Sequence, residues 1–188
     1  MQNDNSQGCF IAVVGPSGAG KDTIMDAARE ALKDDDRFHF ARRIITRPQM
    51  AGTEDHDSLD EIAFAKAVAD GAFALHWQAH GLNYALPRSI DDEIANGLIV
   101  IANVSRRVLD EIRLCYPCRS VVMITARADV LARRLAARGR ETEQDIAARL
   151  AREVSFDNDA ADVVKIDNSG DVALAIDAFL QHLRSVKA

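Results

Sequence analysis

Residues Gly15–Thr23 read GPSGAGKDT. The apolar run Cys9–Val14 precedes them and apolar residues at helical spacing follow, so the sequence predicts a strand, a loop and a helix in succession. The stretch Gly15–Thr23 begins with a match to G-x-x-x-x-G-K, a loop whose backbone amides turn inward on phosphate oxygens. A strand before the match and a helix after it are the context that makes this pattern specific. We therefore expect a nucleotide-binding phosphate loop.

Later apolar runs have the length of buried strands and alternate with helical patterns. The expected strands are Leu98–Ala102, Val121–Thr125 and Val163–Ile166. Helical spacing is present around Val108–Cys115, Val130–Leu135, Ile146–Leu150 and Val172–Leu183. This alternation indicates an α/β fold with a parallel sheet flanked by helices. The polar region Arg42–Pro87 interrupts the pattern as an insertion, where a substrate site could be built.

Size and composition are those of a single compact domain. The chain has 188 residues, of which 48% are hydrophobic, enough for one sizeable core. No apolar run approaches the roughly 20 residues of a membrane span, and the first residues lack the pattern of a signal peptide. We expect a soluble cytoplasmic protein that binds no membrane, and nothing in the sequence predicts its oligomeric state.

Net charge and cysteine content indicate which ligands and which cellular compartment to expect. The net charge of −6 argues against general affinity for nucleic acid, whose backbone attracts an excess of basic side chains. Arginine nevertheless makes up 18 of the 23 basic residues, and its side chain can hold phosphate through two hydrogen bonds. Three cysteines cannot form a closed set of disulfides, which fits a reducing compartment. Cys115 and Cys118 form an isolated C-x-x-C, which we interpret as packing residues.

Asp22 stands where a phosphate loop usually has the Ser or Thr that holds Mg²⁺. A carboxylate binds Mg²⁺ readily, and the neighbouring Thr23 could serve as a substitute ligand. Asp22 could equally cap the start of the helix, which aspartate does well. The sequence leaves both roles open. Lys21 is expected to neutralise charge on the transferred phosphoryl group.

The order of motifs along nearly the whole chain resembles that of the guanylate kinases, a family of nucleoside monophosphate kinases. ITRP, at Ile45–Pro48, resembles the acceptor-phosphate motif T-T-R-x-P. LHWQAHGLNYALP, at Leu75–Pro87, resembles L-E-W…G-N-Y-Y-G-x-P. RLAARGRETEQDIAARL, at Arg134–Leu150, resembles the lid of these kinases.

This resemblance implies a P-loop NTPase fold of nucleoside monophosphate kinase type. It also implies that Arg47 and Tyr84 hold the acceptor phosphate, and that Arg138 and Arg149 of the lid close over the phosphates. The implied division is a core at about 8–40, 97–132 and 151–188, an acceptor-binding insertion at about 41–96 and a lid at about 133–150.

The positions that read guanine in guanylate kinases have changed. A Glu before the Trp is His76 here, an Asp at the end of the third strand is Asn103, and a Ser upstream of T-T-R is Arg43. Two carboxylates are lost and one cation is gained, so we expect GMP to be a poor acceptor. Because an acid is lost at Asn103 and one is gained at Asp22, we also hypothesise that the acidic metal ligand has moved to the phosphate loop.

The chain resembles a related family more closely at these departures: the ribose 1,5-bisphosphate phosphokinases of phosphonate breakdown. The chain resembles them through GPSGAGKDT, RRIITRP, EDH, WQAHGLNY, NVSR and RLAARGRE, although Ala85 stands where both families usually have Gly. The resemblance implies that ATP, with Mg²⁺, phosphorylates the 1-phosphate of ribose 1,5-bisphosphate to give 5-phosphoribosyl 1-diphosphate. The alternatives are a guanylate kinase with altered base contacts and a guanylate-kinase-like binding module without catalysis.

A sugar bisphosphate needs more cations and polar groups around it than a nucleotide does. Arg43 and Arg106 are candidates for binding its second phosphate. Each lies close in sequence to a motif at the end of an expected strand. Glu54, His56 and His76 could hydrogen-bond the sugar hydroxyls, although each histidine could also be a plain loop residue.

The nucleotide site would lie at the phosphate loop. Its expected residues are Gly15, Pro16, Ser17, Gly18, Ala19, Gly20, Lys21, Asp22 and Thr23. By resemblance, Asn168 in the turn DNSG would line the adenine of ATP, although the same residues make a good plain turn.

Overall fold

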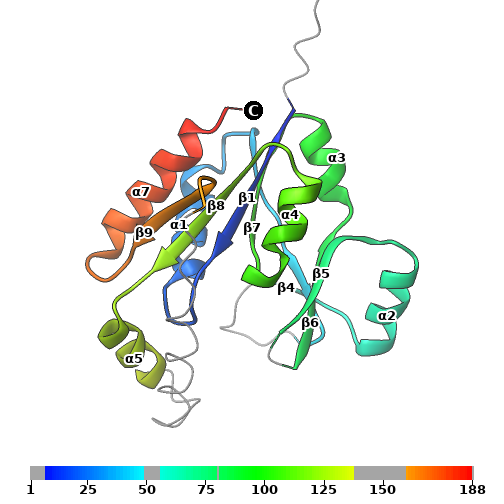
Figure 1. The fold of residues 1–188 in the computed structure, drawn as a ribbon, viewed down its shortest axis with the longest axis horizontal. Helices are drawn as coiled ribbons and strands as arrows, with labels where there is room; N and C mark the ends of the chain where they lie inside the picture. The colour runs from blue at the N-terminus through cyan, green and yellow to red at the C-terminus, as the bar shows by residue number, and fades with distance from the viewer. Residues whose placement is uncertain (1–6, 49–55, 80, 138–159, 188) are drawn as a thin grey trace, which may run out of the picture. The chain divides into compact units, whose positions relative to one another are not determined.

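The computed structural model describes residues 7–48, 56–79, 81–137 and 160–187 (Figure 1). Its chain forms two compact units. Unit 1 comprises Met1–Ala12, Leu32–Ser120 and Val186–Ala188, and unit 2 comprises Val13–Ala31 and Val121–Ser185. Hydrogen bonds order the strands β2-β7-β1-β8-β9 in a five-stranded sheet and β4-β3-β6-β5 in a four-stranded sheet.

Unit 1 holds most of the strands. Its elements are the first residues of β1 (Cys9–Val14), then β2 (Phe38–Phe40), β3 (Arg43–Ile45), β4 (His56–Ser58), α2 (Glu61–Ala69), β5 (Phe73–Ala79), β6 (Leu82–Pro87), α3 (Ser89–Ala95), β7 (Ile99–Asn103), the 3₁₀ turn η1 (Arg106–Val108) and α4 (Leu109–Cys115). β2 and β7 pair in parallel, with Phe38 opposite Ile99. Every residue of β1 and β7 is buried, as expected for strands of a parallel sheet that is covered on both faces.

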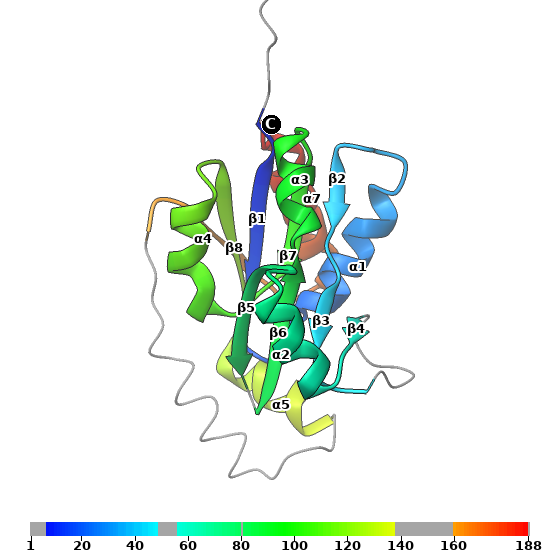
Figure 2. The same cartoon turned by 90° about the vertical axis from the view of Figure 1, so that its right-hand side faces the viewer.

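The predicted insertion forms the four-stranded sheet and its covering helix. β3 pairs in parallel with β4 and antiparallel with β6, and β6 pairs antiparallel with β5. Phe64 of α2 packs on Phe73 of β5, with ring centroids 4.9 Å apart, and Ala85 completes this small core. α2 lies beside β5 and β6 in both views (Figures 1 and 2). The Asp60 side chain accepts a 2.7 Å hydrogen bond from the Ala63 amide, which fixes where α2 begins.

Unit 2 surrounds the phosphate loop. It contains α1 (Lys21–Ala31), most of β8 (Arg119–Thr125), α5 (Ala128–Ala137), β9 (Val163–Asp167) and α7 (Val172–Ser185). β8 and β9 pair in parallel from Val121 opposite Val163 to Thr125 opposite Asp167. α7 lies alongside β9 and α1 (Figure 1). Its buried residues recur at helical spacing and form the apolar face that it packs with: Ala175, Phe179, Leu180 and Leu183.

The predicted α/β architecture is confirmed. β1 has the predicted bounds, and the other three expected strands differ by one or two residues at their ends. β2 was not predicted, because the run Phe38–Phe40 is too short to show a periodic pattern. The helix expected around 146–150 lies outside the described residues. The division into core, insertion and lid stays a prediction.

The cysteines differ in environment. Cys9 is buried and Cys118 half-buried, whereas Cys115 is exposed, so the interpretation of Cys115 as a packing residue is wrong. Burial raises the pKa of the Cys9 thiol, and a hydrogen bond with the Cys118 side chain raises this pKa further, so the Cys9 thiol stays protonated. Within the described ranges, no helix is long and apolar enough to cross a membrane.

Candidate active site

The phosphate loop of unit 2 has a backbone shape that favours glycine. Gly18 and Gly20 have φ angles of 86° and 90°, a region that residues with a Cβ rarely adopt. Lys21 Nζ donates hydrogen bonds to the carbonyls of Gly15 and Pro16, at 2.8 and 3.1 Å. The lysine ammonium group therefore lies against the backbone of the loop.

Asp22 lies at the start of α1, and two roles were considered for it: a ligand of Mg²⁺ and a cap of the helix. The helix begins at Lys21, and the Gly20 carbonyl accepts a 3.1 Å hydrogen bond from the Ile24 amide. Gly20 thus precedes the first turn, in which Asp22 lies, and the cap role and the metal role of Asp22 both stay predictions. Its half-buried carboxylate is still at the helix end where amide dipoles favour negative charge, and Thr23 beside it is exposed.

Arg134 is a loop contact that the sequence analysis missed. It lies on α5, and its Nη1 donates to the Gly18 carbonyl at 3.3 Å. Leu135, the next residue, is buried, and a Cβ on Gly18 would lie 3.4 Å from its side chain. The available signal was helical spacing, since Arg134 precedes the predicted lid residue Arg138 by one turn.

Asn168 also contacts the loop. Its side chain is 1% exposed, and Nδ2 donates to the Ala19 carbonyl at 2.7 Å. A Cβ on Gly20 would lie 2.4 Å from the same nitrogen, so only glycine leaves room for this approach. Oδ1 of Asn168 is buried and has no hydrogen-bond partner among the described residues. The residue expected to line adenine is therefore packed against the phosphate loop.

In unit 1, one face of the four-stranded sheet carries a cation over stacked aromatic rings. The Trp77 and Tyr84 side chains stack with centroids 5.6 Å apart and an interplanar angle of 7°. The Arg43 guanidinium carbon lies 5.6 Å from the centroid of the Tyr84 ring. This distance allows a cation–π interaction, which restricts the orientation of the guanidinium group.

The loop that carries Arg47 is held through its backbone. Ser58 Oγ donates to the Arg47 carbonyl at 2.8 Å, and His56 Nε2 lies 3.4 Å from the same oxygen. Both come from β4, whose register places His56 beside Arg43 and Ser58 beside Ile45. Side chains of paired residues share a face, so His56 and Ser58 lie on the face of Arg43. His56 has no exposed surface, whereas the sequence led us to expect it on a ligand-facing loop.

His76 lies on the opposite face of that sheet. It is opposite Ala85, while its neighbour Trp77 is opposite Tyr84, and successive residues of a strand point to opposite faces. The structure therefore does not bring His76 together with Tyr84.

The end of β7 contributes the remaining residues of unit 1. Asn103 is 7% exposed at the last position of that strand, and Arg106 begins η1 and is half-buried. The following Arg107, which the sequence analysis did not single out, donates from Nη1 to the Gln78 carbonyl at 3.4 Å. This contact holds η1 beside β5.

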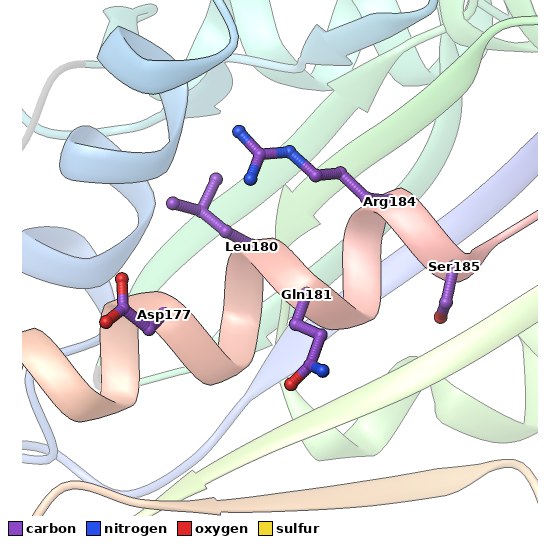
Figure 3. Close-up of a pocket in the computed structure, with 5 residues that line it drawn as sticks. All are labelled: Asp177, Leu180, Gln181, Arg184 and Ser185. Carbon is purple, nitrogen blue, oxygen red and sulfur yellow. The ribbon is translucent and has the colours of Figure 1, made fainter.

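Several predicted residues and sites cannot be described in the same way. Glu54, Arg138 and Arg149 lie outside the described residues. Within the ranges that the structure describes, no group of three or more His, Cys, Asp or Glu side chains is arranged to hold a metal ion. A hollow of about 520 Å³ lies along α7 (Figure 3), and its lining contains none of the predicted site residues: it is formed by Asp177, Leu180, Gln181, Arg184 and Ser185.

Curated relatives match the chain over almost its whole length. The ribose 1,5-bisphosphate phosphokinase PhnN of Brucella melitensis is 68% identical over 186 residues, covering 99% of this chain and 97% of that protein. The protein of the same name from Methylobacterium radiotolerans is 49% identical over 178 residues, covering 95% and 98%. No protein-family model matches the chain.

Solved structures support the fold alone. Guanylate kinase from Anaplasma phagocytophilum superposes with a TM-score of 0.72 at 17% identity, covering 97% of this chain and 88% of that one. An unliganded sugar kinase from Janibacter has a TM-score of 0.53 at 17% identity, covering 94% and 95%.

The two described candidate histidines differ in burial, and their replacement should differ in its effect on stability. His56→Ala leaves a cavity in a fully buried site, so we expect the free energy of unfolding to fall by about 2 kcal/mol or more. His76→Ala removes an exposed side chain, and we expect a change within about 0.5 kcal/mol. Urea denaturation of both variants measures the difference. Equal stability of the two would contradict a structural role for His56.

Proposed function

Because this chain belongs to the ribose 1,5-bisphosphate phosphokinase family, we propose that it transfers the γ-phosphoryl group of ATP to the 1-phosphate of ribose 1,5-bisphosphate. The product is 5-phosphoribosyl 1-diphosphate. An oxygen of the acceptor phosphate forms the new bond to the γ-phosphorus, the bond from that phosphorus to the bridging oxygen breaks, and ADP leaves. With a dianionic acceptor phosphate, no proton has to move in this step.

The reaction therefore needs cations and alignment rather than a general base. Two phosphates repel each other, so both have to be neutralised and held for in-line approach. Arginine and lysine supply that charge without titrating near neutral pH. No Ser/His/Asp or Cys/His arrangement is required.

The ATP phosphates are assigned to the loop of unit 2. Backbone amides of this loop would hold the phosphate oxygens, while Lys21 and the lid residues Arg138 and Arg149 would neutralise the transferred group. Arg134 is added to this set because it already contacts the Gly18 carbonyl. Asn168 is assigned to the loop rather than to adenine, because its side chain is buried against Ala19.

The acceptor is assigned to the face of unit 1 that carries Arg43, Arg47 and Tyr84. Arg43 is already positioned over the Tyr84 ring, and Arg47 belongs to a loop held through its own carbonyl. Arg106, after the end of β7, remains a candidate for the second phosphate, and Asn103 at that end stays a candidate substrate contact. His76 is left out because it lies on the other face, and Glu54 stays a candidate for the sugar hydroxyls.

Asp22 and Thr23 fit a magnesium ion by their chemistry. Both are oxygen donors in or next to the first turn of α1, and one of them carries the charge that a hard cation prefers. Mg²⁺ in kinases takes few protein ligands and completes its shell with phosphate and water, so a cluster of acids is not needed. When bound, the ion would neutralise charge that develops on the β- and γ-phosphate oxygens.

One observation carries the choice of acceptor. The Arg43 guanidinium lies 5.6 Å from the Tyr84 ring centroid, so a permanent cation occupies the position where guanylate kinases have a base-reading Ser. A cation at this place suits a second phosphate, whereas it cannot accept the hydrogen bonds that the N1–H and N2–H₂ groups of guanine donate.

An acceptor panel tests the proposal. The purified protein with Mg·ATP should phosphorylate ribose 1,5-bisphosphate, and the kcat/KM for GMP should be lower by about a hundredfold or more, because its base finds no carboxylate. Ribose 5-phosphate lacks the 1-phosphate and should give no diphosphate product. Mass spectrometry of the separated products identifies each transfer.

Lys21→Ala is the control for this panel, since it should abolish every transfer that depends on the phosphate loop. Efficient phosphorylation of GMP, with little product from ribose 1,5-bisphosphate, would instead make the protein an unusual guanylate kinase. ATP-dependent transfer to neither acceptor would favour a binding module.

The metal role of Asp22 has a test of its own. Asp22→Ser should raise the Mg²⁺ concentration for half-maximal activity by about tenfold, because a charged ligand is replaced by a neutral one. Asp26→Ser is the matched control, since Asp26 lies on the same helix and pairs with Arg29 at 3.1 Å. Magnesium titrations at saturating ATP compare the two. An unchanged Mg²⁺ dependence in Asp22→Ser would rule out the ligand role.

A further inference from the structure

Asn168 is a buried polar side chain that contacts the phosphate loop but takes no part in the bond changes of the proposed reaction. It is 1% exposed and follows β9 directly, at the end of a strand that pairs with β8. Its backbone amide donates to the Thr125 carbonyl at 2.7 Å, so the residue is fixed to the end of β8 before its side chain makes any contact. The side chain then reaches the Ala19 carbonyl at 2.7 Å.

The chemistry of this contact determines which end of the amide faces the loop. A carbonyl oxygen can only accept, so the group 2.7 Å from Ala19 has to be the NH₂ end of Asn168. The oxygen end points elsewhere and has no partner among the described residues. A serine or an aspartate at this position would not supply the same donor at the same reach.

The contact also sets the direction of the next backbone amide. The peptide bond between Ala19 and Gly20 is trans, so its C=O and N–H point in opposite directions. With the Ala19 carbonyl held toward Asn168, the Gly20 N–H has to point away from it. Glycine at position 20 would otherwise let this peptide group rotate easily, because it has no Cβ to restrict φ.

We propose that Asn168 is a positioning residue for the phosphate donor: by holding the Ala19 carbonyl, it keeps the Gly20 N–H turned toward the anion-binding side of the loop. The proposal deepens the assignment of ATP to this loop and rests on it. It also explains the pairing of an asparagine with a glycine, since a Cβ on Gly20 would lie 2.4 Å from Asn168 Nδ2. Preorganised amides bind an oxyanion better than amides that first have to be oriented.

The test follows the Gly20 amide directly by two-dimensional ¹H–¹⁵N NMR while inorganic triphosphate is added. In the wild-type protein this signal should shift on binding. Asn168→Ala should need about tenfold more triphosphate for the same shift, because one orienting hydrogen bond is lost. Asn168→Asp keeps the size of the side chain but presents an oxygen to the Ala19 carbonyl, and it should weaken binding at least as much.

Kinetics add a second readout. The KM for ATP should rise in both Asn168 variants, while the KM for the acceptor stays within about twofold, because only the donor loop is affected. Ser169→Ala is the matched control: Ser169 lies in the same turn, and its side chain accepts from the Arg127 amide at 2.7 Å and donates to Asp167 at 2.5 Å rather than to the loop. Its triphosphate affinity should stay within about twofold of the wild type.

Unchanged triphosphate binding in Asn168→Asp would overturn the positioning role, and so would a wild-type Gly20 signal that does not respond. Should Asn168→Ala fail to fold, the isosteric Asn168→Asp carries the test, with its thermal unfolding midpoint recorded alongside. A wild-type protein that binds triphosphate through Gly20 but phosphorylates no acceptor would contradict the proposed function and still support this inference.

Discussion

Space beside the backbone of the phosphate loop is the constraint on which the donor side of this protein depends. A Cβ on Gly20 would lie 2.4 Å from the Asn168 amide nitrogen, and a Cβ on Gly15 would lie 2.1 Å from the Ile124 carbonyl oxygen. Because these glycines leave room, the end of β8, the turn after β9 and helix α5 can all approach the loop. Three separate segments then contact it through Ile124, Asn168 and Arg134. Glycine leaves the backbone of the loop flexible, and the contacts from those three segments restrict its conformation.

The face of unit 1 that is assigned to the acceptor differs from the phosphate loop, because side chains rather than backbone groups carry its charge. Its charge is presented by arginine on a short-stranded sheet, where the Trp77–Tyr84 stack gives the Arg43 guanidinium a flat surface to lie on. A guanidinium placed in this way keeps its donors in one plane and can hold phosphate through two hydrogen bonds. Lysine would supply the same charge without this orientation. At this face, the orientation of the guanidinium group gives arginine an advantage over lysine.

The sequence predicted those parts of the fold that leave a local pattern. The apolar runs of β1, β7, β8 and β9 and the glycine spacing of the loop were enough for the α/β architecture. The face on which each hairpin side chain lies could not be read in this way. It depends on the register between β5 and β6, and a shift of one residue moves every side chain to the other face. His76 and Tyr84 were therefore expected together and lie apart.

Contacts between residues far apart along the chain could not be predicted from the sequence either. The burial of His56 depends on the pairing of β4 with β3, and the contact between Asn168 and Ala19 joins residues 149 positions apart. In both cases a residue type suited to ligand binding supports the backbone of a neighbouring loop instead. Neither supporting contact leaves a local pattern in the sequence, because each joins segments that are far apart along the chain.

The central claim is that each unit binds its own phosphate group, the ATP phosphates in unit 2 and the acceptor phosphate in unit 1. Calorimetric titration of the wild type, Lys21→Ala and Arg47→Ala with a non-hydrolysable ATP analogue and, separately, with ribose 1,5-bisphosphate tests it most directly. The account predicts that Lys21→Ala weakens binding of the ATP analogue alone and Arg47→Ala weakens binding of the sugar bisphosphate alone, each by about tenfold or more. Loss of both ligands in either variant, or unchanged acceptor binding in Arg47→Ala, would contradict it.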